Sequence, residues 1–208
     1  MKKTLLSGAL LAATAGIAHA QSPSFGIKAG ASLTNVTGNY TTGGDTDFKN
    51  TFGFHGGFVS NLPISGIFSI QPELLYSMKG YKQTGIDPYY AATANIKQTL
   101  HYIDIPVLAR ISTGGLFFEA GPQFGYLVAA KRSQNGDGNI PAISYSGRDN
   151  LRKVDFGYAV GLGYQLPNGP GVGLRYNGGF TNFVHTYEDK GARNSAFQLY
   201  LSYRLGKK

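Results

Sequence analysis

The segment SAFQLYLSYRLG (Ser195 to Gly206) decides the fold of this chain. Apolar and polar side chains alternate along it: Phe197, Leu199, Leu201, Tyr203 and Leu205 lie at every second position, and Gln198, Tyr200, Ser202 and Arg204 lie between them. A period of two puts successive side chains on opposite faces of an extended strand, whereas a helix repeats every 3.6 residues. The segment is therefore predicted to be a β-strand with one apolar and one polar face.

Seven further segments show the same period of two. They cover residues 24–36, 51–61, 68–81, 99–111, 116–129, 154–164 and 171–182. In the third strand of the chain, for example, Phe68, Ile70 and Leu74 alternate with Gln71 and Glu73. The chain is thus predicted to be all-β, with eight antiparallel strands joined in an up-and-down order.

The connections between these segments alternate strictly between long and short. Three short ones lie around Pro63, Gly114 and Pro167, and four long ones cover residues 37–50, 82–98, 130–153 and 183–194. Transmembrane barrels have short periplasmic turns and longer external loops. A tilted strand needs about 9–11 residues to cross the hydrocarbon layer, and a sheet in lipid must close because its edges cannot stay unpaired. We therefore expect an eight-stranded antiparallel up-and-down transmembrane β-barrel.

The first 20 residues are expected to be a cleaved signal peptide. Lys2 and Lys3 precede an apolar run from Leu5 to Ile17, and Ala18-His19-Ala20 resembles a cleavage site with small residues at its ends. The barrel domain is then residues 21–208. The chain has no cysteine, so no lipid anchor on cysteine is expected. These features predict export to the outer membrane of a Gram-negative envelope.

The composition favours a β protein with an apolar exterior. The chain has 30 glycines, 13% aromatic residues and 14% charged residues, against about 25% charged residues in a typical soluble domain. The formal net charge is +8. Nucleic-acid binding is not expected, because the aromatic residues lie on the apolar strand faces rather than among basic residues. Lipid and lipopolysaccharide of the outer membrane are the expected neighbours.

Nine charged residues lie on the polar faces of the strands, where we expect a structural charge network in the lumen. They are Lys28, Glu73, Lys79, Asp104, Arg110, Glu119, Asp155, Arg175 and Arg204. An eight-stranded barrel is only wide enough for side chains to fill it, and buried charges need partners. A narrow or closed lumen, and not a wide pore, is therefore expected.

Alternation alone leaves a second interpretation open. In a soluble periplasmic barrel of the lipocalin kind, the apolar faces would point inward and could hold a small apolar ligand. The spread of Phe and Tyr along the apolar faces, the unequal loops, the low charge content and the nearly balanced charged face all favour the membrane interpretation.

The third long loop is the most basic part of the chain, with Lys131, Arg132, Arg148, Arg152 and Lys153. If it lies outside, it is at the level of lipopolysaccharide phosphates, which arginine and lysine bind well. The alternative is a charged, solvated loop without a particular ligand.

A third interpretation is an envelope lipid-modifying enzyme. It would need a serine, a histidine and an acid near the outer leaflet, and Ser195, His185 and Glu188 could supply them. Their spacing matches no deacylase motif that we recognise, and a loop histidine beside an acid is usually just solvated. We therefore expect a non-enzymatic protein with no catalytic residues, no cofactor and no metal site, and with a structural or surface-interaction role.

Several short motifs resemble those of the outer-membrane β-barrel domain family of Bacteroidetes-type bacteria, whose members are often labelled porin-like or PorT-like. The motifs are FGIKAG (Phe25 to Gly30), PELLY (Pro72 to Tyr76), YIDIPVL (Tyr102 to Leu108), Gly121-Pro122, FGY (Phe156 to Tyr158) and LSYRL (Leu201 to Leu205). The resemblance covers the chain after residue 20. It implies the same barrel fold. We further expect a monomer that the barrel-assembly machinery inserts into the outer membrane.

Overall fold

The computed structural model describes residues 23–38, 47–87, 92–136, 142–148, 151–182 and 192–205. The predicted signal peptide, His185 and Glu188 lie outside these residues. Within them, no helix is long and apolar enough to cross a membrane.

The described part of the chain forms ten strands. They are β1 (Ser24–Thr37), β2 (Asp47–Lys49), β3 (Thr51–Ser65), β4 (Phe68–Asp87), β5 (Ala92–Thr113), β6 (Leu116–Gly136), β7 (Ile143–Ser146), β8 (Val154–Gln165), β9 (Pro170–Asn182) and β10 (Arg193–Leu205).

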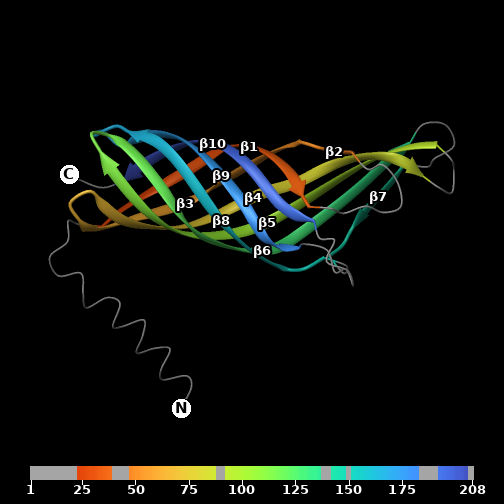
Figure 1. Cartoon of the computed structure of the whole chain (residues 1–208), viewed down its shortest axis with the longest axis horizontal. Helices are drawn as coiled ribbons and strands as arrows, with labels where there is room; N and C mark the ends of the chain where they lie inside the picture. The colour runs from red at the N-terminus through yellow and green to blue at the C-terminus, as the bar shows by residue number, and fades with distance from the viewer. Residues whose placement is uncertain are drawn as a thin grey trace, which may run out of the picture.

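Eight of the strands close into a ring in the order β1-β3-β4-β5-β6-β8-β9-β10, and all neighbours are antiparallel. The first and last strands form the seam, which runs from the pair Phe25 and Leu205 to the pair Thr37 and Arg193. The short strands β2 and β7 pair with the far ends of β4 and β6. Figure 1 shows the resulting cylinder from the side. The predicted eight-stranded up-and-down barrel is confirmed.

The two ends of the barrel differ in how the strands are joined. At one end, which we call the turn end, tight turns lie at Gly66, at Gly114 and after Gln165, and Gly66 and Gly114 have φ values of 47° and 57°. These positive values favour glycine. The first residue of β1, Ser24, and the last residue of β10, Leu205, also lie at the turn end. We call the opposite end, with β2 and β7, the loop end.

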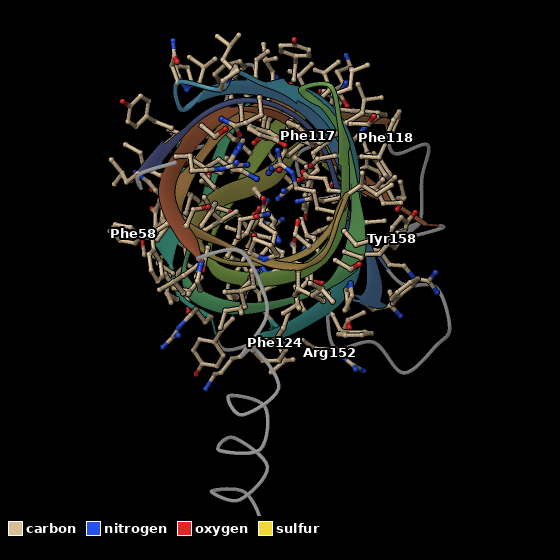
Figure 2. The ribbon with its side chains drawn as sticks, turned by 90° about the vertical axis from the view of Figure 1, so that its left-hand side faces the viewer. Phe58, Phe117, Phe118, Phe124, Arg152 and Tyr158 are labelled. Atoms are coloured by element: carbon tan, nitrogen blue, oxygen red, sulfur yellow. The ribbon has the colours of Figure 1, made fainter. Side chains whose placement is uncertain are left out.

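The apolar faces of the strands point outward. Phe118 is 54% exposed, whereas its neighbour Phe117 is 1% exposed and lies inside the ring; Figure 2 shows the two rings on opposite sides of the wall. Phe25, Leu174 and Leu199 are likewise exposed on the outward faces of their strands. The lipocalin-like alternative, with the apolar faces inward, is therefore wrong.

The strands at the loop end are longer than the alternation predicts. Residues 82–98 were expected to form a loop, but most of them continue β4 and β5, which stay paired from Lys82 and Lys97 to Asp87 and Ala92. The predicted loop 130–153 likewise contains the end of β6 and the strand β7. Polar residues dominate these extensions, so the apolar–polar alternation that marks a strand stops although backbone pairing continues.

An apolar cluster, which we call the apolar cap, closes the lumen toward the loop end. Its buried members are Val36, Tyr81, Leu100, Tyr102, Leu127, Ala130 and Ala192, and Phe48 and Leu151 pack against it. These residues come from four strands of the ring, β1, β4, β5 and β6, from β2, and from the residues just before β8 and β10. The apolar cap thus places apolar side chains in the lumen on its loop-end side.

Glycine makes room for one large side chain in the lumen wall. Tyr200 of β10 pairs in register with Gly30 of β1 on one side and with Gly173 of β9 on the other. A Cβ atom added at Gly173 would overlap the Tyr200 ring, and one at Gly30 would overlap the backbone of Leu199. The narrow ring can therefore hold the buried Tyr200 ring because position 173 lacks a side chain, whereas Gly30 lets the backbones of β1 and β10 approach closely.

We expect Gly173→Ala to destabilise the barrel by about 1–3 kcal/mol, because the added methyl group overpacks against a buried ring. Gly56→Ala is the matched control, since a Cβ there makes only ordinary contacts, at 3.4 Å or more. The stability of both variants is measured by urea unfolding in detergent, with the loss of the fast-migrating band on unheated gels as the readout. Equal midpoints for the two variants would contradict the packing argument.

Candidate functional site in the barrel lumen

Four charged residues from four strands meet in the middle of the lumen, and we call them the central ion cluster: Lys28 of β1, Glu73 of β4, Glu119 of β6 and Arg175 of β9. Arg175 donates from Nη1 and Nη2 to the two oxygens of Glu73, at 2.7 and 2.8 Å, and from Nε to Glu119 Oε1, at 2.8 Å. Lys28 Nζ lies 2.6 Å from Glu73 Oε1. Since β9 and β4 are on opposite sides of the ring, this cluster ties the two walls together.

Neutral side chains complete the central ion cluster. The Tyr200 hydroxyl donates to Glu119 Oε1 at 2.8 Å, and Lys28 Nζ lies 4.0 Å from the centre of the Tyr200 ring. Gln71 Nε2 donates to Glu73 Oε1 at 2.7 Å. Neither Tyr200 nor Gln71 was among the predicted site residues. The only signal for them in the sequence is their position on the polar faces of their strands.

A second group, the outer ion cluster, lies between the central ion cluster and the apolar cap. Lys79 Nζ is 3.0 Å from Asp104 Oδ1 and 3.5 Å from Asp155 Oδ2. Asn194 Nδ2 donates to Asp155 Oδ2 at 3.0 Å and to the Tyr102 hydroxyl at 3.3 Å. One lysine is thus shared by two carboxylates.

The remaining two of the nine predicted lumen residues, Arg110 and Arg204, lie at the turn end. Arg110 donates to Gln71 Oε1 at 2.8 Å and to Ser112 Oγ at 3.3 Å, and its guanidinium carbon lies 3.6 Å from the centre of the Phe117 ring. Arg204 is half-buried. Among the described residues, neither arginine forms an ion pair with a carboxylate.

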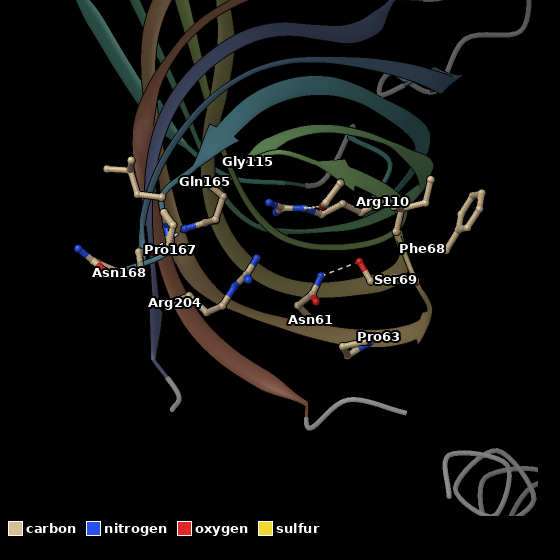
Figure 3. A pocket seen from close by; sticks show the side chains of 15 residues that line it. Asn61, Pro63, Phe68, Ser69, Arg110, Gly115, Gln165, Pro167, Asn168 and Arg204 are labelled. Carbon is tan, nitrogen blue, oxygen red and sulfur yellow. Dashed lines mark hydrogen bonds between the residues drawn. The ribbon is translucent and has the colours of Figure 1, made fainter. Parts of the chain in front are cut away.

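Both arginines line a cavity of about 700 Å³ that opens at the turn end, and we call it the vestibule. Its other lining residues include Asn61, Ser69 and Gln165 (Figure 3). Two further cavities in the lumen have volumes of only about 20 and 10 Å³. In the described part of the chain, side chains thus fill most of the lumen beyond the vestibule.

The structure divides the lumen charges along the axis in a way that the sequence does not reveal. The turn-end half holds four basic residues, Lys28, Arg110, Arg175 and Arg204, against Glu73 and Glu119. The outer ion cluster holds one basic residue against two acidic ones. The near balance of the nine charges therefore conceals a positive surplus at the turn end and a negative one toward the loop end.

The five basic residues expected at the outer surface all lie at the loop end, but they differ in exposure. Lys131 and Arg132 on β6, and Arg152 and Lys153 before β8, are exposed. Arg148 is half-buried and donates from Nη1 to the Leu127 carbonyl oxygen at 2.8 Å. Four of the five are thus available to a ligand.

The residues considered for catalysis are not brought together by any described contact. The Ser195 hydroxyl donates to the Asn35 carbonyl oxygen at 3.3 Å. His185 and Glu188 lie outside the described residues. Within the described ranges, no group of three or more His, Cys, Asp or Glu side chains could hold a metal ion.

We expect Arg175→Met to destabilise the barrel by about 3–5 kcal/mol, because it leaves the buried carboxylates of Glu73 and Glu119 without their main partner. Arg175→Lys keeps the positive charge but loses the planar set of guanidinium N–H donors, and it should destabilise the barrel less than Arg175→Met does. Arg193→Met removes an exposed arginine from β10 and should change stability by no more than about 0.5 kcal/mol. Urea unfolding in detergent compares the three, and a wild-type midpoint for Arg175→Met would refute the structural importance of the cluster.

A family model and a solved structure relate this chain to outer-membrane proteins. No curated protein sequence matches the chain. Among solved structures, Neisserial surface protein A shares 12% identity at a TM-score of 0.52, over 89% of this chain and 100% of that one. The outer membrane protein OprG from Pseudomonas aeruginosa shares 8% identity at a TM-score of 0.47, over 90% and 98%. Ail, the attachment invasion locus protein of Yersinia pestis, shares 14% identity at a TM-score of 0.46, over 89% and 100%.

At 12% identity, the likeness to Neisserial surface protein A shows the fold alone. The family model of the outer membrane protein beta-barrel domain matches residues 19–185, which is most of the chain. The turn end is therefore the periplasmic end, and the loop end faces outward. The chain is an outer-membrane protein and belongs to the outer membrane protein beta-barrel domain family.

Proposed function

We propose that the protein is a non-enzymatic outer-membrane barrel with a closed lumen, which supports the envelope or contacts ligands through its external hairpins. The observation that carries this proposal is the filling of the lumen. Above the vestibule, the central ion cluster ties opposite walls together, the outer ion cluster follows it, and the apolar cap covers both. A solute would have to displace paired charges and then an apolar cluster to pass.

The extended hairpins favour a role at the outer surface. The β4–β5 hairpin stays paired up to Asp87 and Ala92, and β6 continues to Gly136 with β7 at its side. Figure 1 shows these strands projecting past the rest of the ring at the loop end. Paired strands hold residues at their tips in a more fixed geometry than free loops do.

Lipopolysaccharide is the outer partner that the exposed charges favour. Arg152 and Lys153 directly precede Val154, which is 45% exposed and begins the apolar face of β8. Lys131 and Arg132 lie on β6 beside the exposed Tyr145 of β7. Basic side chains just beyond an apolar belt are at the height of headgroup phosphates, which arginine can bind with two donors.

The rest of the proposal concerns assembly and activity. We propose that the protein is a monomer and that the barrel-assembly machinery inserts it. A closer relation to porin-like or PorT-like proteins of Bacteroidetes-type bacteria stays a prediction. The hydroxyl of Ser195 is bonded to a backbone carbonyl, which favours a structural role for it over a nucleophilic one. Incubation of the purified protein with lipopolysaccharide should release no fatty acid.

Planar-bilayer recordings test the closed lumen. We expect purified wild-type protein to give no stable conductance steps in 1 M KCl, because paired charges and the apolar cap leave no continuous water column. The double variant Leu100→Ser/Leu127→Ser disrupts the cap and should give at most brief openings, since the two ion clusters remain. Regular long-lived steps from the wild-type protein would refute a closed barrel.

Binding to lipopolysaccharide micelles tests the surface role. We expect Arg152→Gln/Lys153→Gln to weaken binding about tenfold, since each charge-assisted hydrogen bond lost costs on the order of 1 kcal/mol or more. Lys49→Gln/Arg193→Gln removes the same number of positive charges elsewhere at the loop end and is the matched control. Equal weakening by both double variants would indicate attraction by net charge alone and would contradict a specific contact.

A further inference from the structure

The vestibule presents two arginines to each other without an acid between them. Arg110 comes from β5 and Arg204 from β10, which are on opposite sides of the ring. Figure 3 shows the two side chains pointing toward each other across the mouth. None of the described residues that line the vestibule is acidic. Two like charges that share an uncompensated cavity favour an anion between them.

The geometry of Arg110 adds a second, independent observation. The residue is only 4% exposed, and the hydrogen bonds to Gln71 and Ser112 use its Nη1 and Nε groups. Its Nη2 is buried and has no hydrogen-bond partner among the described residues. A buried guanidinium N–H group without an acceptor is costly. The stacking on Phe117 holds the guanidinium in place. The two N–H groups of Nη2 remain without an acceptor among the described residues.

The central ion cluster does not supply the missing negative charge. Both oxygens of Glu73 already accept from Arg175, and Lys28 bonds to one of them. Glu119 accepts from Arg175, Tyr200 and Gln71. The positive surplus of the turn-end half is therefore concentrated on Arg110 and Arg204.

The remainder of the vestibule suits a small polar molecule. Its volume of about 700 Å³ is within the range of about 300–1,000 Å³ that is common for ligand sites. Neutral amide groups line it: Asn61, which donates to Ser69 Oγ at 2.8 Å, and Gln165, which donates to the Gly169 carbonyl oxygen. Their carbonyl oxygens can accept hydrogen bonds from hydroxyl or amine groups of a ligand.

We propose that the vestibule is a binding site for a small soluble oxyanion, a phosphate or carboxylate group on a periplasmic molecule, held between Arg110 and Arg204. The guanidinium of Arg110 binds the oxyanion from the closed side, and that of Arg204 binds it from the mouth. The site opens to the periplasm and does not require passage through the lumen. It is thus independent of any function at the outer surface.

The test uses full-length mature protein folded in a neutral maltoside detergent, with inorganic phosphate as the probe. The ¹⁵N–¹H signals of Arg110 Nε and Arg204 Nε should shift together and saturate as phosphate is added, at constant ionic strength. Arg110→Gln and Arg204→Gln should each weaken binding about tenfold or more, since a hydrogen bond to a charged group is worth about 1.5–3 kcal/mol. Arg193→Gln, the exposed control on β10, should leave the affinity unchanged.

Three outcomes would overturn the proposal. One is a shift that does not saturate, and another is an affinity for phosphate that neither Arg110→Gln nor Arg204→Gln lowers. The third concerns the source of the phosphate: if the arginine signals respond to phosphatidylglycerol in nanodiscs but not to free phosphate or acetate in detergent, the ligand is a lipid headgroup. The unheated-gel band shift of each variant confirms that it is folded, so a loss of binding reports on the site.

Discussion

Closure of the ring between β1 and β10 is the constraint on which the rest of this structure depends. In the hydrocarbon layer no water can satisfy a free strand edge, and each unpaired backbone group costs several kcal/mol. The seam from Phe25 and Leu205 to Thr37 and Arg193 removes both edges at once. Closing eight strands also fixes a small radius. The small radius explains why glycines flank Tyr200 and why charged residues of opposite walls can touch.

The charged lumen follows from that radius. Buried ion pairs are weak evidence for stability, because desolvation offsets most of their attraction. They are more informative about strand register. A slip of β9 by one residue would turn Arg175 toward lipid and leave two carboxylates buried without their partner. The central ion cluster thus penalises wrong pairings of β4, β6 and β9 much more than any of the outward-facing leucines could.

The faces of the strands could be predicted from the sequence, because a period of two requires only the order of residues along one strand. Phe117 and Phe118 show this, since their places inside and outside follow from alternation. The partners of the lumen charges could not be predicted. Glu73 and Lys79 lie on one face of β4 at different heights, because they are six residues apart along the strand, but which residues of the other strands share each height depends on the stagger between strands. The loop-end extensions were missed for another reason: with polar residues on both faces, pairing continues without any apolar pattern to mark it.

The position of Tyr200 and Asn194 in the last strand of the chain has a kinetic consequence. Their partners, Glu119, Asp155 and Tyr102, belong to β6, β8 and β5, so these contacts form only when β10 arrives. Lumen packing and seam pairing are therefore completed in one step. Conversely, β10 cannot peel away from β1 without breaking backbone hydrogen bonds in the wall and side-chain hydrogen bonds across the interior together. Such coupling favours all-or-none unfolding of the closed barrel, in which the loss of the seam and the loss of the lumen contacts are one event.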